Sequence, residues 1–229
     1  MNKYRIENAA SATPELYLYG PIGGDFFGDG LSAEKVVKDI NALGKKKDIH
    51  VRIDSPGGNV FDGFNIYNAL VRNPATITVY IDALAASIAS VIAMAGSKIH
   101  IAENSLMMVH EPYGFAVGTA EEMRKQANLL DKTRDNLLQT YVNKSGQKPE
   151  KVSDWMRAET WFNATEALQA GLATDIVTAP AMAASASKEF IEKFGYRNCP
   201  AWFQSSKDKP RLEAYRVKAG QVFRLATNS

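Results

Sequence analysis

Short apolar runs typical of β-strands alternate with helix-like stretches along most of this chain, and this order limits its fold more than any other feature. At 49–54 apolar and polar residues alternate, as in a half-buried strand, and a helix-like stretch follows at 64–71. Further strands are expected at 16–19, 76–82, 98–102, 106–110 and 174–178, with helices at 30–44, 87–96, 120–144 and 163–171. Strands that alternate with helices favour an α/β domain with a largely parallel sheet.

Capping residues mark where three of these helices begin. Ser32 is a side chain of the type that caps a helix N-terminus, directly before a periodic apolar stretch. Thr119 with Glu122, and Asn163 with Glu166, each match the capping box, in which the two side chains bond to each other's backbone N–H groups. These pairs place two helix starts within a residue or two.

Composition excludes several classes of function. The 229 residues are enough to bury a full core, and 45% hydrophobic with 23% charged residues is ordinary for a soluble globular protein. A net charge of +2, without a basic stripe interleaved with aromatic residues, predicts no nucleic-acid partner. Cys199 is the only cysteine, so no intramolecular disulfide can form. The three histidines lack the spacing of zinc ligands, so no metal site is expected.

No segment has the character of a membrane span. The longest apolar run, at 83–96, is well short of the roughly 20 residues that cross a bilayer. The first fifteen residues lack the apolar core of a signal peptide. We therefore expect a cytoplasmic protein with no membrane partner.

A change of composition after Thr178 divides the chain. Residues 1–178 carry the alternating pattern and are expected to form the folded domain. The stretch at 179–187 is rich in small residues and is interpreted as a linker. Residues 188–229 form a tail with a helix-like start and a basic end, expected to lie outside the domain core.

Three segments contain residues suited to nucleophilic chemistry. Ser87 lies among small residues at the start of a helix-like stretch, where the helix dipole favours a developing negative charge. Gly57 and Gly58 directly follow a strand, so their backbone N–H groups could bind an oxyanion. His110 ends an apolar strand before a loop and could accept the proton of a serine. Taken singly, these residues fit equally well a helix cap, a tight turn and a structural histidine.

Other residues in these segments have plainer interpretations. Ser90, one helical turn after Ser87, is expected to point into the core, and His50 and His100 lie within strands and look structural. No GxSxG motif occurs, which disfavours an ordinary α/β-hydrolase. A triad needs an acid that orients His110, and composition does not choose among six carboxylates: Glu103, Glu111, Asp154, Glu159, Glu166 and Asp175.

Together these segments resemble the Clp protease proteolytic subunit family (ClpP), which are serine peptidases with a crotonase-like fold. The matching motifs occur in the family's order, as IDSPGG at 53–58, AASIASVIAMAG at 85–96, MVHEP at 108–112 and TWFNATEALQAGLATDIV at 160–177. The resemblance covers roughly residues 16–178. It implies an α/β, ClpP/crotonase-like fold of repeated β-β-α units with an appended C-terminal tail.

The resemblance also implies roles for individual residues. Ser87 becomes the nucleophile, His110 the general base and Glu159 the acid, where the family usually has an aspartate that is one methylene shorter. The N–H groups of Gly58 and Ile88 would bind the oxyanion, and neither a metal nor a cofactor is required. The AETW sequence at 158–161 is similar to the ClpP-like proteases of tailed phages and prophages, which process capsid or scaffold proteins during head maturation in the cytoplasm of a bacterial host.

The resemblance finally implies partners. We expect a protein or peptide substrate and a homo-oligomeric ring, either a heptamer or stacked heptamers, with the helix at 120–144 in the contact between rings. The residues before the first strand do not resemble the loops that dock an AAA+ unfoldase, which leaves that partner open. Two alternatives remain: a crotonase-type acyl-CoA enzyme, which also uses backbone N–H groups on an oxyanion, and a catalytically silent structural ring.

Overall fold

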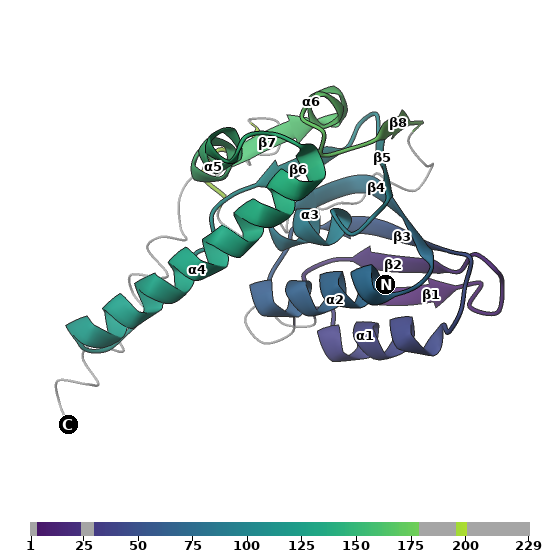
Figure 1. Cartoon of the computed structure of the whole chain (residues 1–229), viewed down its shortest axis with the longest axis horizontal. Coiled ribbons are helices and arrows are strands. Elements are labelled where there is room, and N and C mark those ends of the chain that lie inside the picture. The colour runs from purple at the N-terminus through teal and green to yellow at the C-terminus, as the bar shows by residue number, and fades with distance from the viewer. Residues whose placement is uncertain (1–3, 24–29, 179–195, 201–229) are drawn as a thin grey trace, which may run out of the picture.

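A computed structural model describes residues 4–23, 30–178 and 196–200, which form one mixed sheet with helices packed on it (Figure 1). The order across the sheet is β1-β2-β3-β4-β5-β8, and β6 and β7 extend it beside the end of β4. Neighbouring strands are parallel except in the pairs β1–β2 and β6–β7. The bounds are β1 Tyr4–Glu7, β2 Glu15–Tyr19, β3 Asp48–Ser55, β4 Thr76–Ala86, β5 Lys98–Ala102, β6 Leu106–Val109, β7 Thr160–Asn163 and β8 Asp175–Val177.

In the described residues, six helices pack around this sheet. Helices α1, α2 and α3 lie along one face of it, and α4 runs past the sheet so that its N-terminal end projects from the rest (Figure 1). The bounds are α1 Ala33–Ala42, α2 Val60–Arg72, α3 Ile88–Ala93, α4 Ala120–Ser145, α5 Pro149–Arg157 and α6 Ala164–Gln169. Among the helices of the described ranges, none combines the length and the apolar character needed to cross a bilayer. Within the same ranges, no group of three or more His, Cys, Asp or Glu side chains is placed to hold a metal ion.

Strand β4 connects the two parts of the sheet. Its first half pairs with β3 and β5, and at its last three residues, Leu84, Ala85 and Ala86, β6 takes the place of β5 while Ala85 still pairs with β3. All three are almost fully buried, so this end of the strand is fixed on both sides. The residue that follows β4 is therefore held where β3, β4 and β6 meet.

Glycine lets α2 approach α3 closely. A Cβ added at Gly63 would lie 2.1 Å from Cγ1 of Ile88, which is far closer than two carbon atoms can approach. Ile88 is itself 2% exposed and belongs to the main hydrophobic core. The contact fixes the start of α3 relative to the turn that precedes α2.

The expected elements are confirmed with small shifts at their ends. Ser32 accepts a hydrogen bond from the Lys35 N–H at the start of α1, and both expected capping boxes are present, at α4 and α6. Three elements were not expected from the sequence: β1, α5 and β7. Pro149 is the first residue of α5, a position where proline is favoured because its missing N–H has no helical partner there.

Little of the C-terminal region belongs to the described residues. The expected linker at 179–187 and the helix-like start of the tail lie outside them. Tyr196–Pro200 is described, and it contacts the domain: Cys199 in this stretch is 5% exposed and packs against residues of β4 and β6.

Candidate active site

Ser87 lies at the junction of β4 and α3, after Ala86 ends the strand and before Ile88 begins the helix. Its backbone has φ 55° and ψ −130°, which is uncommon for a residue other than glycine. The Ser87 N–H donates a hydrogen bond of 2.9 Å to the carbonyl oxygen of Met108 in β6. Such strain persists only where the surrounding structure enforces it, and it is concentrated at functional sites.

The Ser90 side chain stabilises the junction at Ser87 through hydrogen bonds. It is fully buried, as expected from its position one turn further along the helix. Its Oγ lies 2.6 Å from the carbonyl oxygen of Ser87, 3.0 Å from that of Met108 and 2.8 Å from the hydroxyl of Tyr141. The hydroxyl therefore joins the Ser87 junction to β6 and α4. It is a structural group rather than a second nucleophile.

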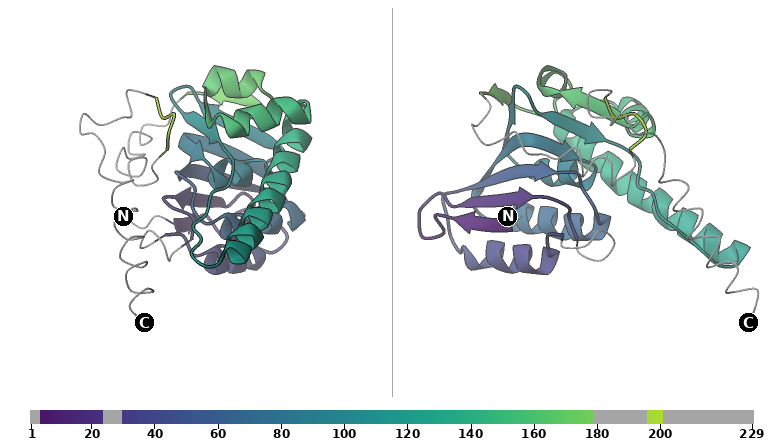
Figure 2. Two further views of the ribbon diagram at one scale, coloured as in Figure 1. Left: turned by 90° about the vertical axis from the view of Figure 1, so that its left-hand side faces the viewer. Right: turned by 180° about the vertical axis from the view of Figure 1, so that it is seen from behind.

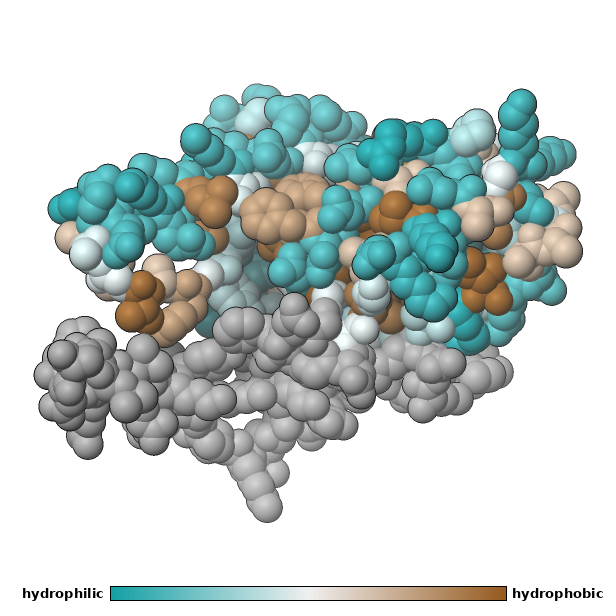
Figure 3. All heavy atoms as spheres, turned by 90° about the horizontal axis from the view of Figure 1, so that it is seen from below, coloured by the Kyte–Doolittle hydropathy of each residue, from teal (hydrophilic) through white to brown (hydrophobic). Residues whose placement is uncertain are grey.

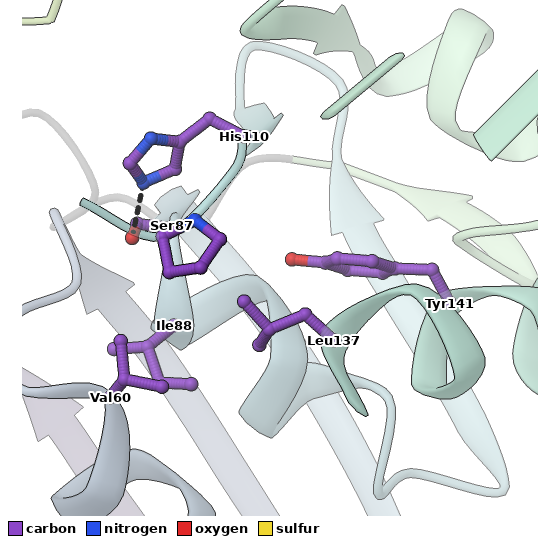
Figure 4. A pocket seen from close by; sticks show the side chains of 7 residues that line it. Val60, Ser87, Ile88, His110, Leu137 and Tyr141 are labelled. Carbon is purple, nitrogen blue, oxygen red and sulfur yellow. Dashed lines mark hydrogen bonds between the residues drawn. The ribbon is translucent and has the colours of Figure 1, made fainter. Parts of the chain in front are cut away.

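His110 directly follows β6, and its side chain contacts that of Ser87. Its Nε2 lies 2.7 Å from the Oγ of Ser87, and the two side chains face each other across the site (Figure 4). Burial lowers the pKa of His110 to about 4; the charge of Glu159 acts against this effect and that of Arg197 adds to it. An imidazole held neutral in this way is able to accept the proton of the serine hydroxyl.

The Gly57–Gly58 turn lies directly against Ser87. Gly57 has φ 91°, and a Cβ there would lie 2.7 Å from both the carbonyl oxygen of Ala86 and the Cβ of Ser87. At Gly58, where φ is 148°, a Cβ would lie 2.0 Å from the carbonyl oxygen of Ile22. Gly57 can lie this close to Ser87, and Gly58 this close to Ile22, only because neither residue has a side chain.

Two backbone N–H groups border the serine. The Ile22 N–H donates to the Gly57 carbonyl and the Asn59 N–H to the Ile22 carbonyl, each at 2.8 Å, and these bonds fix the turn on both sides of Gly58. Within the part of the chain that the structure describes, neither the N–H of Gly58 nor that of Ile88 donates a hydrogen bond to another backbone group. Ile88 is the first residue of α3, where the N–H groups have no acceptor within the helix.

Glu159 is buried close to His110, but its carboxylate has other partners. The residue is 4% exposed, and its backbone has φ 49°. Its Oε1 accepts hydrogen bonds from the Asn198 N–H at 2.7 Å and from Trp161 Nε1 at 3.4 Å, and its Oε2 lies 3.8 Å from Nε of Arg197. Among the described residues, it does not hydrogen-bond to His110 and acts on that imidazole through its charge alone.

The other carboxylates that the sequence left open are used elsewhere or exposed. Asp154 pairs with Arg157 at 3.0 Å, and Glu166 completes the capping box of α6. Of the six candidates, only Glu159 is buried: Glu103, Glu111, Asp154, Glu166 and Asp175 are partly or fully exposed. Burial beside His110 therefore separates Glu159 from the rest.

An apolar pocket opens on one side of the Ser87–His110 pair. Tyr141 and Leu137 of α4 face Ile88 across it, as Figure 4 shows. The side chains that line it are those of Val60, Ser87, Ile88, His110, Pro112, Leu137 and Tyr141. A hydrophobic side chain placed next to the serine would find apolar surface here.

The residues on the other side of the pair were not anticipated from the sequence. Tyr196 lies edge-on to His110, with ring centroids 5.6 Å apart, and Trp161 lies edge-on to Tyr196 at 5.7 Å. Trp161 belongs to the AETW and TWFN segments, but nothing in them indicated a contact with the site, and Tyr196 stands in no motif and follows a stretch that resembles a linker and tail. No local signal could have placed it at the site.

The sequence comparison agrees with this geometry. The model of the Clp protease family matches residues 26–180, a span that contains Ser87, His110 and Glu159 and covers well over half of the chain. The mixed sheet with its helices also fits the ClpP-like, crotonase-type fold. The chain therefore belongs to the Clp protease family.

Proposed function

We propose that this protein is a serine endopeptidase in which Ser87 is the nucleophile and His110 the general base. Membership of the Clp protease family implies a serine peptidase that acts on protein substrates as an oligomeric ring. The observation that carries the residue assignment is the 2.7 Å contact between Ser87 Oγ and His110 Nε2 at a strained strand–helix junction. Nucleophile and base within hydrogen-bond distance are the signature of an activated serine.

The proposed reaction uses four groups of the chain. Ser87 Oγ attacks the peptide carbonyl while His110 Nε2 takes its proton, and His110 then gives that proton to the leaving amine. The N–H groups of Gly58 and Ile88 bind the oxyanion, and a donor of this kind is typically worth about 10²–10³ in rate. Water then attacks the carbonyl of the acyl-enzyme while His110 takes its proton, and His110 gives that proton to Ser87 Oγ as the acyl group leaves.

Glu159 is proposed as the third member of the triad. Its charge already favours the protonated form of His110, which is the form that develops during attack. To orient the imidazole directly, its carboxylate must exchange the Asn198 N–H for a ring N–H of His110. The longer glutamate side chain, where the family usually has aspartate, gives the carboxylate the reach for both positions.

The apolar pocket beside Ser87 indicates what the site accepts. Apart from Ser87 and His110 its walls are apolar, and its free space holds little more than a water molecule, so we expect cleavage after small hydrophobic residues. On the similarity of the AETW sequence to phage and prophage proteases, we propose that the natural substrate is a capsid or scaffold protein, processed in the cytoplasm of a bacterial host.

Exposed hydrophobic side chains support the proposal of a heptameric ring or stacked heptamers. They gather on the loop before α4 and on its projecting half, namely Tyr113, Phe115, Val117, Met123 and Leu129. Hydrophobic groups are visible at the end of the molecule from which α4 projects (Figure 3). Apolar groups of this kind usually mark contacts with other protein. Native mass spectrometry that finds only monomers at micromolar concentration would contradict this assembly.

A fluorophosphonate probe tests the assignment directly. The probe should label the wild-type chain at Ser87, as peptide mapping would show, and Ser87→Ala should lose the label and all cleavage of casein. Ser153→Ala, a serine of α5 that does not line the pocket, should behave as wild type. Equal labelling of wild type and Ser87→Ala would show that the serine protease assignment is wrong. Turnover of an acyl-CoA without labelling would favour the crotonase-type alternative.

A further inference from the structure

The five described residues of the tail, Tyr196–Pro200, lie on the site and not away from it. Figure 2 shows this short yellow-green segment on the side of the domain where β6 and β7 lie. The hydroxyl of Tyr196 donates a hydrogen bond to the carbonyl oxygen of Pro56, the residue before the Gly57–Gly58 turn. A residue 140 positions further along the chain thus contacts the loop that would bind the oxyanion.

The Tyr196 ring contacts the catalytic pair itself. It lies edge-on to the His110 ring, with an interplanar angle of 81°, and edge-on to Trp161 at 77°. Burial raises the pKa of Tyr196 well above its usual value, and a hydrogen bond with the Ser87 side chain offsets part of that effect. The tyrosine therefore touches the nucleophile, the base and the oxyanion loop together.

The next residues engage the acid. The backbone N–H of Asn198 donates to Glu159 at 2.7 Å, and its side-chain Nδ2 donates to the carbonyl oxygen of Ala158 at 2.5 Å. Arg197, although exposed, brings its guanidinium to 3.8 Å from the same carboxylate. The segment binds the carboxylate from two successive residues, so Glu159 is directed toward the segment.

Cys199 anchors the segment in apolar surroundings. It is 5% exposed, and burial raises the pKa of its thiol to about 11. Partly buried Trp161 and Tyr196 flank this contact. The buried residues around Cys199 come from the end of β4 and from β6, namely Leu84, Ala86, Leu106 and Met108. A buried anchor beside an aromatic side chain is typical of a specific binding contact and not of a chain end lying loosely on a surface.

We propose that Tyr196–Pro200 is an internal ligand that occupies the substrate side of the site and inhibits the enzyme until it is displaced. This inference rests on the proposed function, because it takes Ser87, His110 and Glu159 as the catalytic residues. A substrate peptide must reach Ser87 Oγ and the glycine turn, and the Tyr196 side chain already contacts both. Since the segment is part of the same chain, a substrate has to compete with a tethered ligand.

The single cysteine provides a measurement of segment release that does not depend on catalysis. A maleimide probe reacts with Cys199 only when the segment leaves its apolar contact, so the labelling rate reports that opening. Tyr196→Ala removes two edge-to-face ring contacts and the bond to Pro56. We expect Cys199 in that variant to react about tenfold faster or more. Tyr17→Ala, a change of the same type at a tyrosine of β2 whose hydroxyl bonds to Glu15, is the matched control and should react as wild type.

Two further measurements test whether release of Tyr196–Pro200 relieves the inhibition. Tyr196→Ala should also speed fluorophosphonate labelling of Ser87 and casein cleavage by about tenfold. Conversely, a chain already labelled at Ser87 should react faster at Cys199, because two ligands that exclude each other at one site weaken each other reciprocally. A synthetic peptide with the sequence of residues 196–200 should slow Ser87 labelling in the variant.

The outcomes separate this proposal from the proposed function. Cys199 that reacts equally fast in wild type and Tyr196→Ala overturns the docking of the segment, whatever Ser87 does. If Cys199 is protected in wild type but Ser87 is labelled equally fast in wild type and Tyr196→Ala, the segment docks without inhibiting. That result overturns the inhibition and leaves the serine protease assignment standing. Absence of Ser87 labelling in both chains refutes the proposed function and the inhibition with it. Cleavage of the tail in wild type but not in Ser87→Ala would make the segment a substrate and overturn its role as inhibitor.

Discussion

The pH dependence of stability tests whether His110 is held as a neutral imidazole. Burial lowers the pKa of His110 to about 4, whereas an unfolded histidine titrates near 6.5. Between these values the unfolded chain binds a proton that the folded chain does not, so unfolding becomes more favourable as the pH falls. The contribution to stability is fully present above about pH 6.5 and is lost progressively down to about pH 4.

The size of this loss follows from the two pKa values. At about 1.36 kcal/mol for each pKa unit, the full difference is worth about 3 kcal/mol, and about 2.5 kcal/mol of it falls between roughly pH 7.5 and 4.5. His110→Asn carries no titrating ring and should lack this loss. Burial and the charge of Asp82 raise the pKa of Asp54 to about 7, which opposes the trend, but Asp54 is present in both chains and cancels in their difference.

The assay is urea unfolding of wild type and His110→Asn, followed by tryptophan fluorescence at a series of pH values. The protein concentration must be held constant, because association stabilises the folded state by mass action. The free energy of unfolding of wild type should fall by about 2.5 kcal/mol relative to the variant over that interval. Two parallel curves, with a constant difference between the chains, would refute the reasoning. Because the lowered pKa keeps His110 neutral, the fluorophosphonate probe should still label Ser87 well below pH 6.5.

Three further changes have clear expected effects. Gly57→Ala places a Cβ 2.7 Å from Ala86 O and Ser87 Cβ at a positive φ, so it should destabilise by about 2–5 kcal/mol and abolish Ser87 labelling. The control Gly44→Ala, with nothing within 4 Å, should cost about 1 kcal/mol in urea unfolding and leave labelling intact; equal effects would contradict this. Ser90→Ala leaves the Tyr141 hydroxyl without its buried partner and should cost about 1–3 kcal/mol, and an unchanged unfolding free energy would count against the structural role of Ser90. Asp54→Asn removes a half-buried carboxyl whose pKa is about 7. The variant should therefore gain stability relative to wild type, by up to about 4 kcal/mol, as the pH increases from about 4 to 7, whereas a pH-independent difference would contradict the raised pKa.

Local features of the chain could be predicted because their causes are local. The capping pairs Thr119–Glu122 and Asn163–Glu166 satisfy backbone groups within one helical turn, so the sequence contains the whole interaction. The inward direction of Ser90 follows from helical spacing alone. The missed helix α5 has a similar local signal in Pro149, which ends one helix pattern and also opens the next.

What the sequence could not provide depends on contacts between distant segments. Strand β7 exists because β6 pairs with it in antiparallel register, more than fifty residues away in the chain. The burial of Glu159, which separates it from five other carboxylates, arises from the same packing. Tyr196 and Asn198 contact the site through side chains and backbone groups that no periodicity marks. The order and spacing of motifs locate the segments of the candidate site, whereas three-dimensional packing decides which carboxylate and which tail residues join them.

The projecting half of α4 has a consequence for how subunits would come together. The helix has 26 residues, or about 39 Å, and within the described structure its buried side chains are Thr133, Leu137 and Tyr141, all in the second half. A helical stretch without packing is only marginally stable in water, so the amide hydrogens of the first half should exchange with solvent far faster than those near Tyr141. A partner that packs on Met123 and Leu129 would then slow that exchange. Subunits that associate through the first half of α4 would have to order it, and this cost lowers their affinity. Assembly could then be followed by the slower amide exchange of that half.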